Sequence, residues 1–139
     1  MTGKKTVKIF TIVSHALIIL GVGHGIGFMG LIDVASIPNL ISDYGFTLKG
    51  SFSDRIMSVG LISLIGKVLL LISFFIKKIK TKEILEFLGL ILLWVSFFFL
   101  NFNLGSNSSG GIIFFTGIPF LISSVIFAFV MVFGNFTKK

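Results

Sequence analysis

Hydrophobic residues run along this chain in four long, nearly uninterrupted stretches separated by short polar connections. Each stretch is about as long as the roughly 20 apolar residues that a helix needs to cross a bilayer. A strand of a membrane barrel needs about half that length and alternates between apolar and polar residues. The pattern therefore predicts an all-α integral membrane protein, a single domain over residues 1–139 built as a four-transmembrane-helix bundle. The predicted spans are about 9–31, 56–76, 84–102 and 112–134.

The composition agrees with lipid as the solvent around most of the chain. Apolar residues make up 55% of the sequence and charged residues only 12%, against roughly 25% charged in soluble domains. Cysteine is absent, which excludes disulfides, thiolate metal sites and cysteine nucleophiles. The net charge of +7 does not indicate nucleic-acid binding, because the basic residues flank the apolar stretches and form no basic and aromatic stripe.

The positions of lysine and arginine predict the orientation of the bundle. Nine of the twelve lie before residue 9, in the 77–83 connection or in the C-terminal tail. The positive-inside rule places these three stretches, and with them both termini, in the cytoplasm. An even number of spans agrees with that placement. We expect the first apolar run to be a retained span, because it is longer than a signal peptide requires, and we expect a bacterial inner membrane as its location.

The connection over residues 32–55 has an internal apolar pattern. Ile37, Leu40, Ile41 and Tyr44 follow the i, i+3, i+4, i+7 spacing of one helical face. This spacing predicts a short amphipathic helix on the outer membrane surface. The alternative is a packed loop that covers the mouth of the bundle.

Lys67 is the most informative single residue, because it lies near the middle of the second predicted span. A charge at that depth costs at least about 3 kcal/mol. Gly60 and Ser63 share its helical face, so we expect Lys67 to face the bundle interior. Acidic residues occur only near the ends of the spans. We therefore expect the amine to be neutral, to bond to hydroxyls and carbonyls, or to meet an acidic partner subunit or an anionic ligand.

The first span contains a glycine-rich segment around His24. Its glycines form two overlapping small-xxx-small pairs, which favour close approach of another helix. They are Gly21, Gly23, Gly25 and Gly27. His24 is predicted in the outer half of the membrane near the depth of Lys67, so the two side chains can line a common cavity. The simpler interpretation is a histidine that bonds to a neighbouring helix. His15 is expected on the opposite face of the same helix.

The fourth span contains a proline with two hydroxyl residues on its face. Pro119 cannot donate a helical hydrogen bond and is expected to kink the helix. Thr116 and Ser123 lie on the same face and can satisfy the freed backbone groups or provide acceptors for Lys67. A purely structural kink is the alternative.

These features favour a non-enzymatic membrane protein without cofactor or metal. No carboxylate, cysteine or third histidine completes a metal shell at membrane depth, and no Ser–His–acid set lies at one depth. We predict an accessory or structural subunit of a larger complex, or a homo-oligomer packed through the glycine-rich first helix. Its expected partners are the lipid bilayer and other membrane subunits or itself.

The alternative function is a small transporter, channel or binder of a lipophilic or anionic ligand, with a path past His24 and Lys67. The basic cluster from Lys77 to Lys82 can also recruit anionic lipid headgroups. In layout the chain is similar to DoxX-like four-helix membrane proteins, with a glycine-containing first span, a sizeable outer connection and three further spans. Lys67 stands where an acidic residue would strengthen that resemblance.

Overall fold

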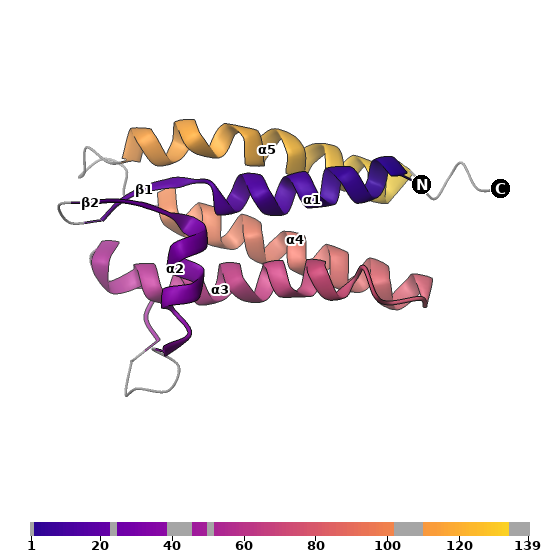
Figure 1. Cartoon of the computed structure of the whole chain (residues 1–139), viewed down its shortest axis with the longest axis horizontal. Helices are drawn as coiled ribbons and strands as arrows, with labels where there is room; N and C mark the ends of the chain where they lie inside the picture. Colours follow the sequence, from indigo (N-terminus) through magenta and orange to yellow (C-terminus); the bar gives the residue numbers. More distant parts are fainter. Residues whose placement is uncertain (1, 23–24, 39–45, 50–51, 102–109, 134–139) are drawn as a thin grey trace.

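The computed structural model describes residues 2–22, 25–38, 46–49, 52–101 and 110–133, and it is mostly helical (Figure 1). Four long helices lie along its longest axis. Along the chain, a two-stranded hairpin and a short helix come between the first and the second of these helices. In chain order the elements are α1 (Thr2–Ala16), β1 (Ile19–Val22), β2 (Gly25–Phe28), α2 (Met29–Ala35), α3 (Phe52–Ile72), α4 (Ile79–Asn101) and α5 (Gly110–Phe133).

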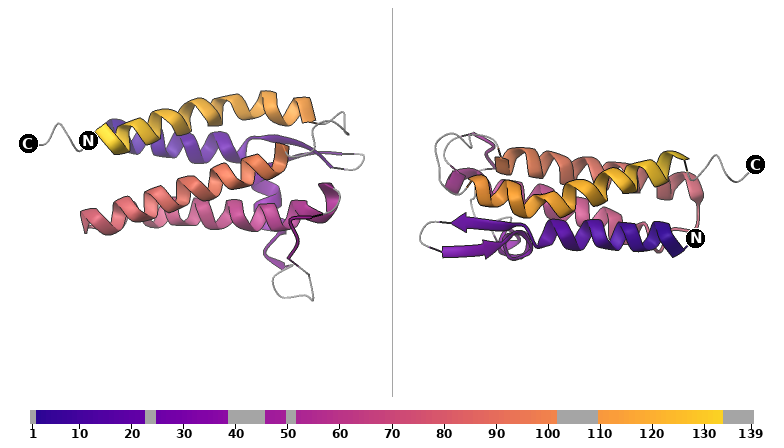
Figure 2. Two further views of the ribbon diagram at one scale, coloured as in Figure 1. Left: turned by 180° about the vertical axis from the view of Figure 1, so that it is seen from behind. Right: turned by 90° about the horizontal axis from the view of Figure 1, so that it is seen from above.

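The long helices form two closely packed pairs, α1 with α5 and α3 with α4 (Figure 2). The start of α1, the turn between α3 and α4 and the end of α5 lie at the same end of the bundle (Figure 1). We call it the lysine end. Its described lysines are Lys4, Lys5, Lys8, Lys77, Lys78, Lys80 and Lys82. The hairpin and the start of α5 lie at the opposite end, which we call the hairpin end.

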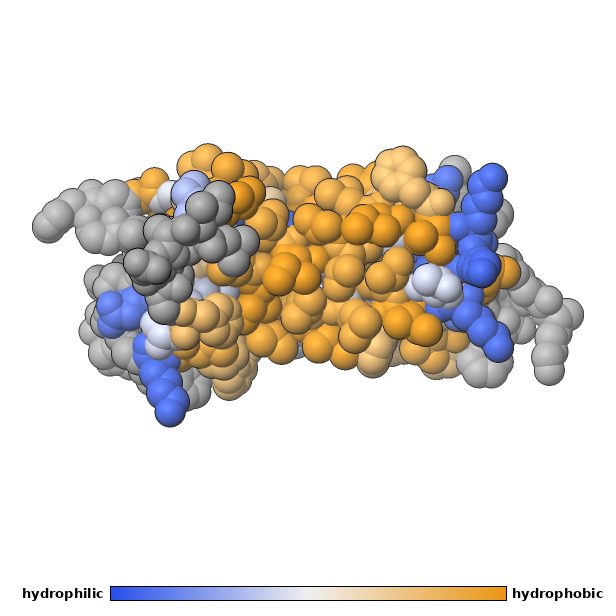
Figure 3. Space-filling model, turned by 90° about the horizontal axis from the view of Figure 1, so that it is seen from below, coloured by the Kyte–Doolittle hydropathy of each residue, from blue (hydrophilic) through white to orange (hydrophobic). Residues whose placement is uncertain are grey.

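Three of the helices are long and apolar enough to cross a membrane. Their apolar segments are Asp54–Ile72 in α3, Ile79–Asn101 in α4 and Gly111–Phe133 in α5. The space-filling view shows a broad hydrophobic belt between the two ends, with the hydrophilic residues gathered beyond it (Figure 3). Helical segments of 19 to 23 residues are about as long as the roughly 30 Å of hydrocarbon that a spanning helix must cross.

The first predicted span is not one continuous helix. The helix expected over residues 9–31 ends at Ala16, and β1 and β2 form an antiparallel pair of strands in which Ile19 pairs with Phe28 and Val22 with Gly25. Each glycine in a helix costs about 1 kcal/mol relative to alanine, and here several occur within one turn or two. They also alternate with large apolar residues, which is the period of a strand.

The hairpin changes the meaning of the glycine-rich segment. Gly21, Gly25 and Gly27 lie in strands, where the small-xxx-small rule for helix packing does not apply. Gly23 and His24 lie outside the described residues, and so does most of the amphipathic helix expected from Ile37 to Tyr44.

The backbone around the hairpin finds partners within the bundle. Met29 N donates to the carbonyl of Ile18 at 2.9 Å, and Ile19 N donates to Thr116 Oγ1 at 3.1 Å. Leu20 is fully buried whereas Ile26 is 79% exposed, as opposite faces of the hairpin require. Backbone groups that lack partners are costly in an apolar environment, so these bonds make a hairpin tolerable beside the spanning helices.

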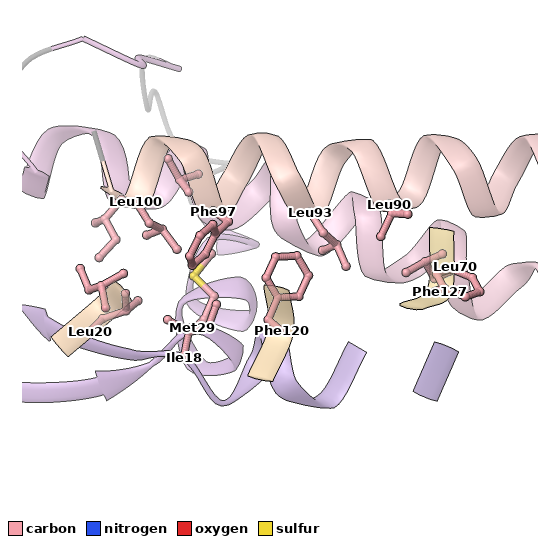
Figure 4. Close-up of a cluster of buried hydrophobic side chains, with 13 residues drawn as sticks. Ile18, Leu20, Met29, Leu70, Leu90, Leu93, Phe97, Leu100, Phe120 and Phe127 are labelled. Atoms are coloured by element: carbon pink, nitrogen blue, oxygen red, sulfur yellow. The ribbon is translucent and has the colours of Figure 1, made fainter. Parts of the chain in front are cut away.

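The apolar core runs as a column along the bundle axis (Figure 4). Leu70, Leu90 and Phe127 fill its part nearest the lysine end, and Phe120 and Leu93 fill its middle. Its remaining labelled members lie toward the hairpin end. They are Ile18, Leu20, Met29, Phe97 and Leu100.

Two glycines allow the close approach of α3 and α4, and substitution of one of them tests that packing. A Cβ on Gly89 would lie 2.8 Å from the carbonyl oxygen of Gly66 and 2.8 Å from Leu70 Cγ. We expect Gly89→Ala to lower the free energy of unfolding by about 1–3 kcal/mol through overpacking. The measurement is unfolding by SDS titration in mixed micelles.

Gly111→Ala is the matched control, because a Cβ at this helical position meets nothing within 4 Å. It should leave stability unchanged or raise it by up to about 1 kcal/mol. Equal effects of the two substitutions would contradict the close α3–α4 contact.

Candidate functional site

A buried ion pair joins α2 to α3. The Lys67 amine donates to Asp33 Oδ2, and the two side chains are 8% and 5% exposed. The expectation that Lys67 has no acidic partner in its own chain was therefore wrong. Asp33 lies near the end of a span in the sequence, but the hairpin turns the chain back so that α2 rests on α3.

Small residues allow α2 to lie close to two long helices. A Cβ on Gly60 of α3 would meet Ile32 Cγ2 at 2.9 Å and the Ile32 carbonyl oxygen at 3.1 Å. A Cβ on Gly30 would lie 3.4 Å from Ala16 Cβ at the end of α1. Ser36 follows the last residue of α2 and caps it, and its hydroxyl donates to the carbonyl of Asp33 at 2.6 Å. These contacts hold Asp33 at the depth of Lys67.

His15 forms the second part of the site. This histidine is fully buried, and its Nε2 shares a hydrogen bond of 2.9 Å with the Ser96 hydroxyl of α4. Its Nδ1 lies 3.4 Å from the Ser63 hydroxyl of α3, and its ring meets Phe120 of α5 edge-on with the centroids 4.6 Å apart. One side chain of α1 thus contacts all three other long helices.

His15 was not among the predicted site residues, although the sequence contains a signal for it. In α1 the polar residues Lys4, Lys8, Thr11 and His15 recur at spacings of four, three and four, which places them on one helical face. In a soluble protein such a stripe would be solvated. In this apolar chain the stripe faces inward, and Lys8, Thr11 and His15 are all buried.

A second charged cluster lies at the lysine end. Glu86 of α4 is fully buried, with its oxygens 2.6 Å from Lys8 Nζ and 2.8 Å from Lys4 Nζ. Lys8 also donates to the Ser73 hydroxyl at 2.7 Å and lies 4.0 Å from the centroid of the Phe74 ring. This cluster ties the start of α1 to α4 and to the turn after α3.

The hydroxyl groups of Thr116 and Ser123 in α5 form their hydrogen bonds with groups other than Lys67. Ser123 Oγ shares a hydrogen bond of 3.2 Å with Ser14 of α1. Thr116 Oγ1 accepts from Ile19 N and donates to the carbonyl of Ile112 at 2.7 Å. Pro119 lies between them, exposed on the outside of the helix. This polar stripe fastens α5 to α1 and to the hairpin.

The site is enclosed by apolar side chains on two sides. Ile18 and Met29 are fully buried toward the hairpin end, and Leu70 lies one turn beyond Lys67 toward the lysine end (Figure 4). Within this enclosure Asp33 Oδ1 is buried without a hydrogen-bond partner among the described residues. A buried acceptor of this kind costs about 1–3 kcal/mol, more when it is charged.

The chemistry available at this site is proton exchange and binding of hydrogen-bond donors. Lys67 and Asp33 can hold a proton on either partner, and His15 lies 3.4 Å from Ser63, one turn before Lys67 on α3. Over the described ranges no three His, Cys, Asp or Glu side chains come together in a way that could hold a metal ion. Comparison of the chain with protein-family models, with curated protein sequences and with solved structures gives no match.

Removal of one partner from the buried pair tests its structure. We expect Lys67→Met to lower the free energy of unfolding by about 3–5 kcal/mol, because Asp33 stays buried without its cation. The double substitution Lys67→Met with Asp33→Leu should recover most of that loss, since both charges are then gone. SDS titration of the purified variants gives the two values.

Lys49→Met is the control, because Lys49 is exposed and precedes the start of α3, away from the buried pair in that helix. Its effect should stay within about 0.5 kcal/mol. A double variant as unstable as Lys67→Met alone would show that the two side chains do not form a pair.

Proposed function

We propose that this chain is a small membrane transport protein in which a proton and a small cationic solute compete for the Asp33 carboxylate. The observation that carries the proposal is the Lys67–Asp33 pair. It is buried inside an apolar bundle, and one carboxylate oxygen lacks a hydrogen-bond partner within the described part of the chain.

Stability alone does not explain why such a pair is present. Ionisable groups at membrane depth are expensive and commonly belong to ion pathways and proton relays. Replacement of a buried ion pair by well-packed apolar residues is often neutral or stabilising. A purely structural contact between α2 and α3 needs no charge, because Gly60 already lets Ile32 pack closely.

The Lys67–Asp33 pair is neutral overall, so the acceptor oxygen that it leaves without a hydrogen bond, and not its net charge, favours a cationic solute over an anionic one. Lys67 is already neutralised by Asp33, so an arriving anion would find no unpaired cation there. The free position is Asp33 Oδ1, which accepts hydrogen bonds and attracts positive charge. A cationic solute therefore fits this site better than the anionic or lipophilic ligand that was expected from Lys67 alone.

Exchange at this site conserves charge. When Lys67 releases its proton, the Asp33 carboxylate keeps its negative charge, and a small cation takes the place of the ammonium group. When the proton returns, Lys67 reclaims the carboxylate and the cation leaves. His15 shares a hydrogen bond with Ser96 and lies 3.4 Å from Ser63, which is one turn before Lys67 on α3, so the His15–Ser63 contact is the route by which we propose that the proton reaches or leaves Lys67.

An accessory-subunit role is the second proposal, and one observation favours it. The hairpin and α2 present large apolar side chains outward, with Ile26 79%, Leu31 62% and Val34 63% exposed. Another membrane chain can pack on this face. The other features that favoured this role now have explanations within the chain, since Lys67 has a partner and the glycine segment forms a hairpin. In both proposals the lysine end faces the cytoplasm and the membrane is a bacterial inner membrane.

Cation–proton exchange can be measured in proteoliposomes. The vesicles carry an acidic interior reported by acridine orange, and Na⁺ or guanidinium is added outside as the chloride salt. We expect at least one of these cations to dissipate the pH gradient through the wild-type protein. Lys67→Gln with Asp33→Asn should abolish the effect, because a neutral pair neither holds the proton nor attracts the cation.

The matched control exchanges the other buried pair, with Lys8→Gln and Glu86→Gln in one chain. This variant should retain gradient dissipation within about twofold, since it leaves His15, Asp33 and Lys67 intact. Choline chloride should have no effect, because its bulky quaternary ammonium can neither coordinate the carboxylate as Na⁺ does nor donate an N–H as guanidinium does. Failure of both small cations with the wild type, or equal rates for the two double variants, would sink the transport proposal.

A further inference from the structure

The lysine end carries far more positive charge than its own acidic groups can neutralise. Residues 2–8 and 73–86 contain seven lysines and two glutamates. One of those glutamates, Glu86, is buried and already bound by Lys4 and Lys8. Four lysines remain exposed at the surface. They are Lys5, Lys77, Lys78 and Lys80. The hydrophilic band at this end of the molecule is plain in Figure 3.

Internal contacts hold these exposed lysines in one surface. Lys8 bonds to Glu86 in α4 and to Ser73 in the turn, and Phe74 lies against its amine. The start of α1 is thereby fixed beside the α3–α4 turn, although about 65 residues separate them in the chain. A charge cluster that served only to orient the chain during insertion would need no such rigid arrangement.

Large apolar side chains lie exposed within the same two segments as the lysines or directly after them. Phe10 of α1 is 56% exposed, Phe75 in the turn is 84% exposed and Ile79 at the start of α4 is 69% exposed. Lysines with exposed aromatic and aliphatic groups beside them match a ligand that has a phosphate and a hydrocarbon tail. A soluble phosphate would make no use of the apolar groups.

We propose that the lysine end is a binding site for anionic phospholipids. The lipid phosphates meet Lys5, Lys77, Lys78 and Lys80, and the acyl chains pack on the neighbouring apolar side chains. The Lys8–Glu86 contact positions the site, because it holds its two halves together. This proposal stands apart from cation–proton exchange, since it involves the opposite part of α1 and none of His15, Asp33 or Lys67.

Native mass spectrometry of the detergent-purified protein tests the proposal. The protein is titrated with phosphatidylglycerol and, separately, with phosphatidylcholine of the same acyl chains. We expect at least tenfold tighter binding of phosphatidylglycerol. Each lysine contributes on the order of fivefold to such binding. The triple variant K77Q/K78Q/K80Q should therefore lose the preference, while its affinity for phosphatidylcholine stays within about twofold.

Two single variants form a matched pair. Lys78→Gln should weaken phosphatidylglycerol binding about fivefold. Lys49→Gln removes an exposed lysine shortly before the start of α3, whose other end leads to the lysine end, and should leave binding unchanged. Circular dichroism checks that all variants keep their helical content, which exposed lysine substitutions should not alter.

Glu86→Gln tests the positioning role. It leaves every exposed lysine in place, yet it should weaken phosphatidylglycerol binding severalfold because the two segments are no longer held together. Equal affinity of the wild type for both lipids would overturn the site. So would an unchanged triple variant, or full competition by soluble glycerol phosphate at the lipid's own concentration.

Discussion

The interior ion pair between Lys67 and Asp33 is the contact around which the unusual part of this fold is arranged. An ammonium group cannot remain charged and alone in an apolar bundle, because its desolvation costs several kcal/mol. A carboxylate that pairs with it offsets that cost. The described parts of the long helices supply none to Lys67, whereas the strands that follow α1 return the chain as α2 and bring Asp33 to it. The non-helical segment beside the spanning helices thereby makes the pair possible.

Polar contacts also join the two halves of the bundle. The pairs α1–α5 and α3–α4 are each held by extensive apolar packing, while α1 meets α3 and α4 largely through its polar stripe. Lys8 reaches Glu86 and Ser73 at the lysine end, and His15 reaches Ser63 and Ser96 in the middle. In a low-dielectric interior such bonds are strong and directional, so they set the register of α1 against its neighbours.

This division places the two proposed activities in different parts of one molecule. The proposed exchange site lies under α2, a helix of only seven residues. If α2 moved away from Lys67, the Asp33 carboxylate would become accessible. The lipid site lies at the lysine end, where the buried Glu86 holds two segments together. Apolar layers built from Leu70, Leu90 and Phe127 separate them. Substitutions in either place can therefore be interpreted independently, since distant sites usually act additively.

The sequence by itself predicted four spans, and the last three correspond to helices long and apolar enough to span a membrane, because continuous hydrophobicity is a local property of each segment. It also placed Lys67 in the interior. It misjudged residues 19–22 and 25–28, where alternation of glycine with large apolar residues was the better guide than the length of the apolar run. The orientation and the accessory or transport role remain predictions.

Only the tertiary structure decided which polar groups meet. Lys67 and Asp33 are 34 residues apart, Lys8 and Ser73 are 65 apart, and His15 and Ser96 are 81 apart. No periodicity within one segment encodes such pairings, because they depend on how the hairpin redirects the chain and on which glycines let helices approach. The sequence determined that charges had to be buried, and the packing of α2 on α3 decided how they are neutralised.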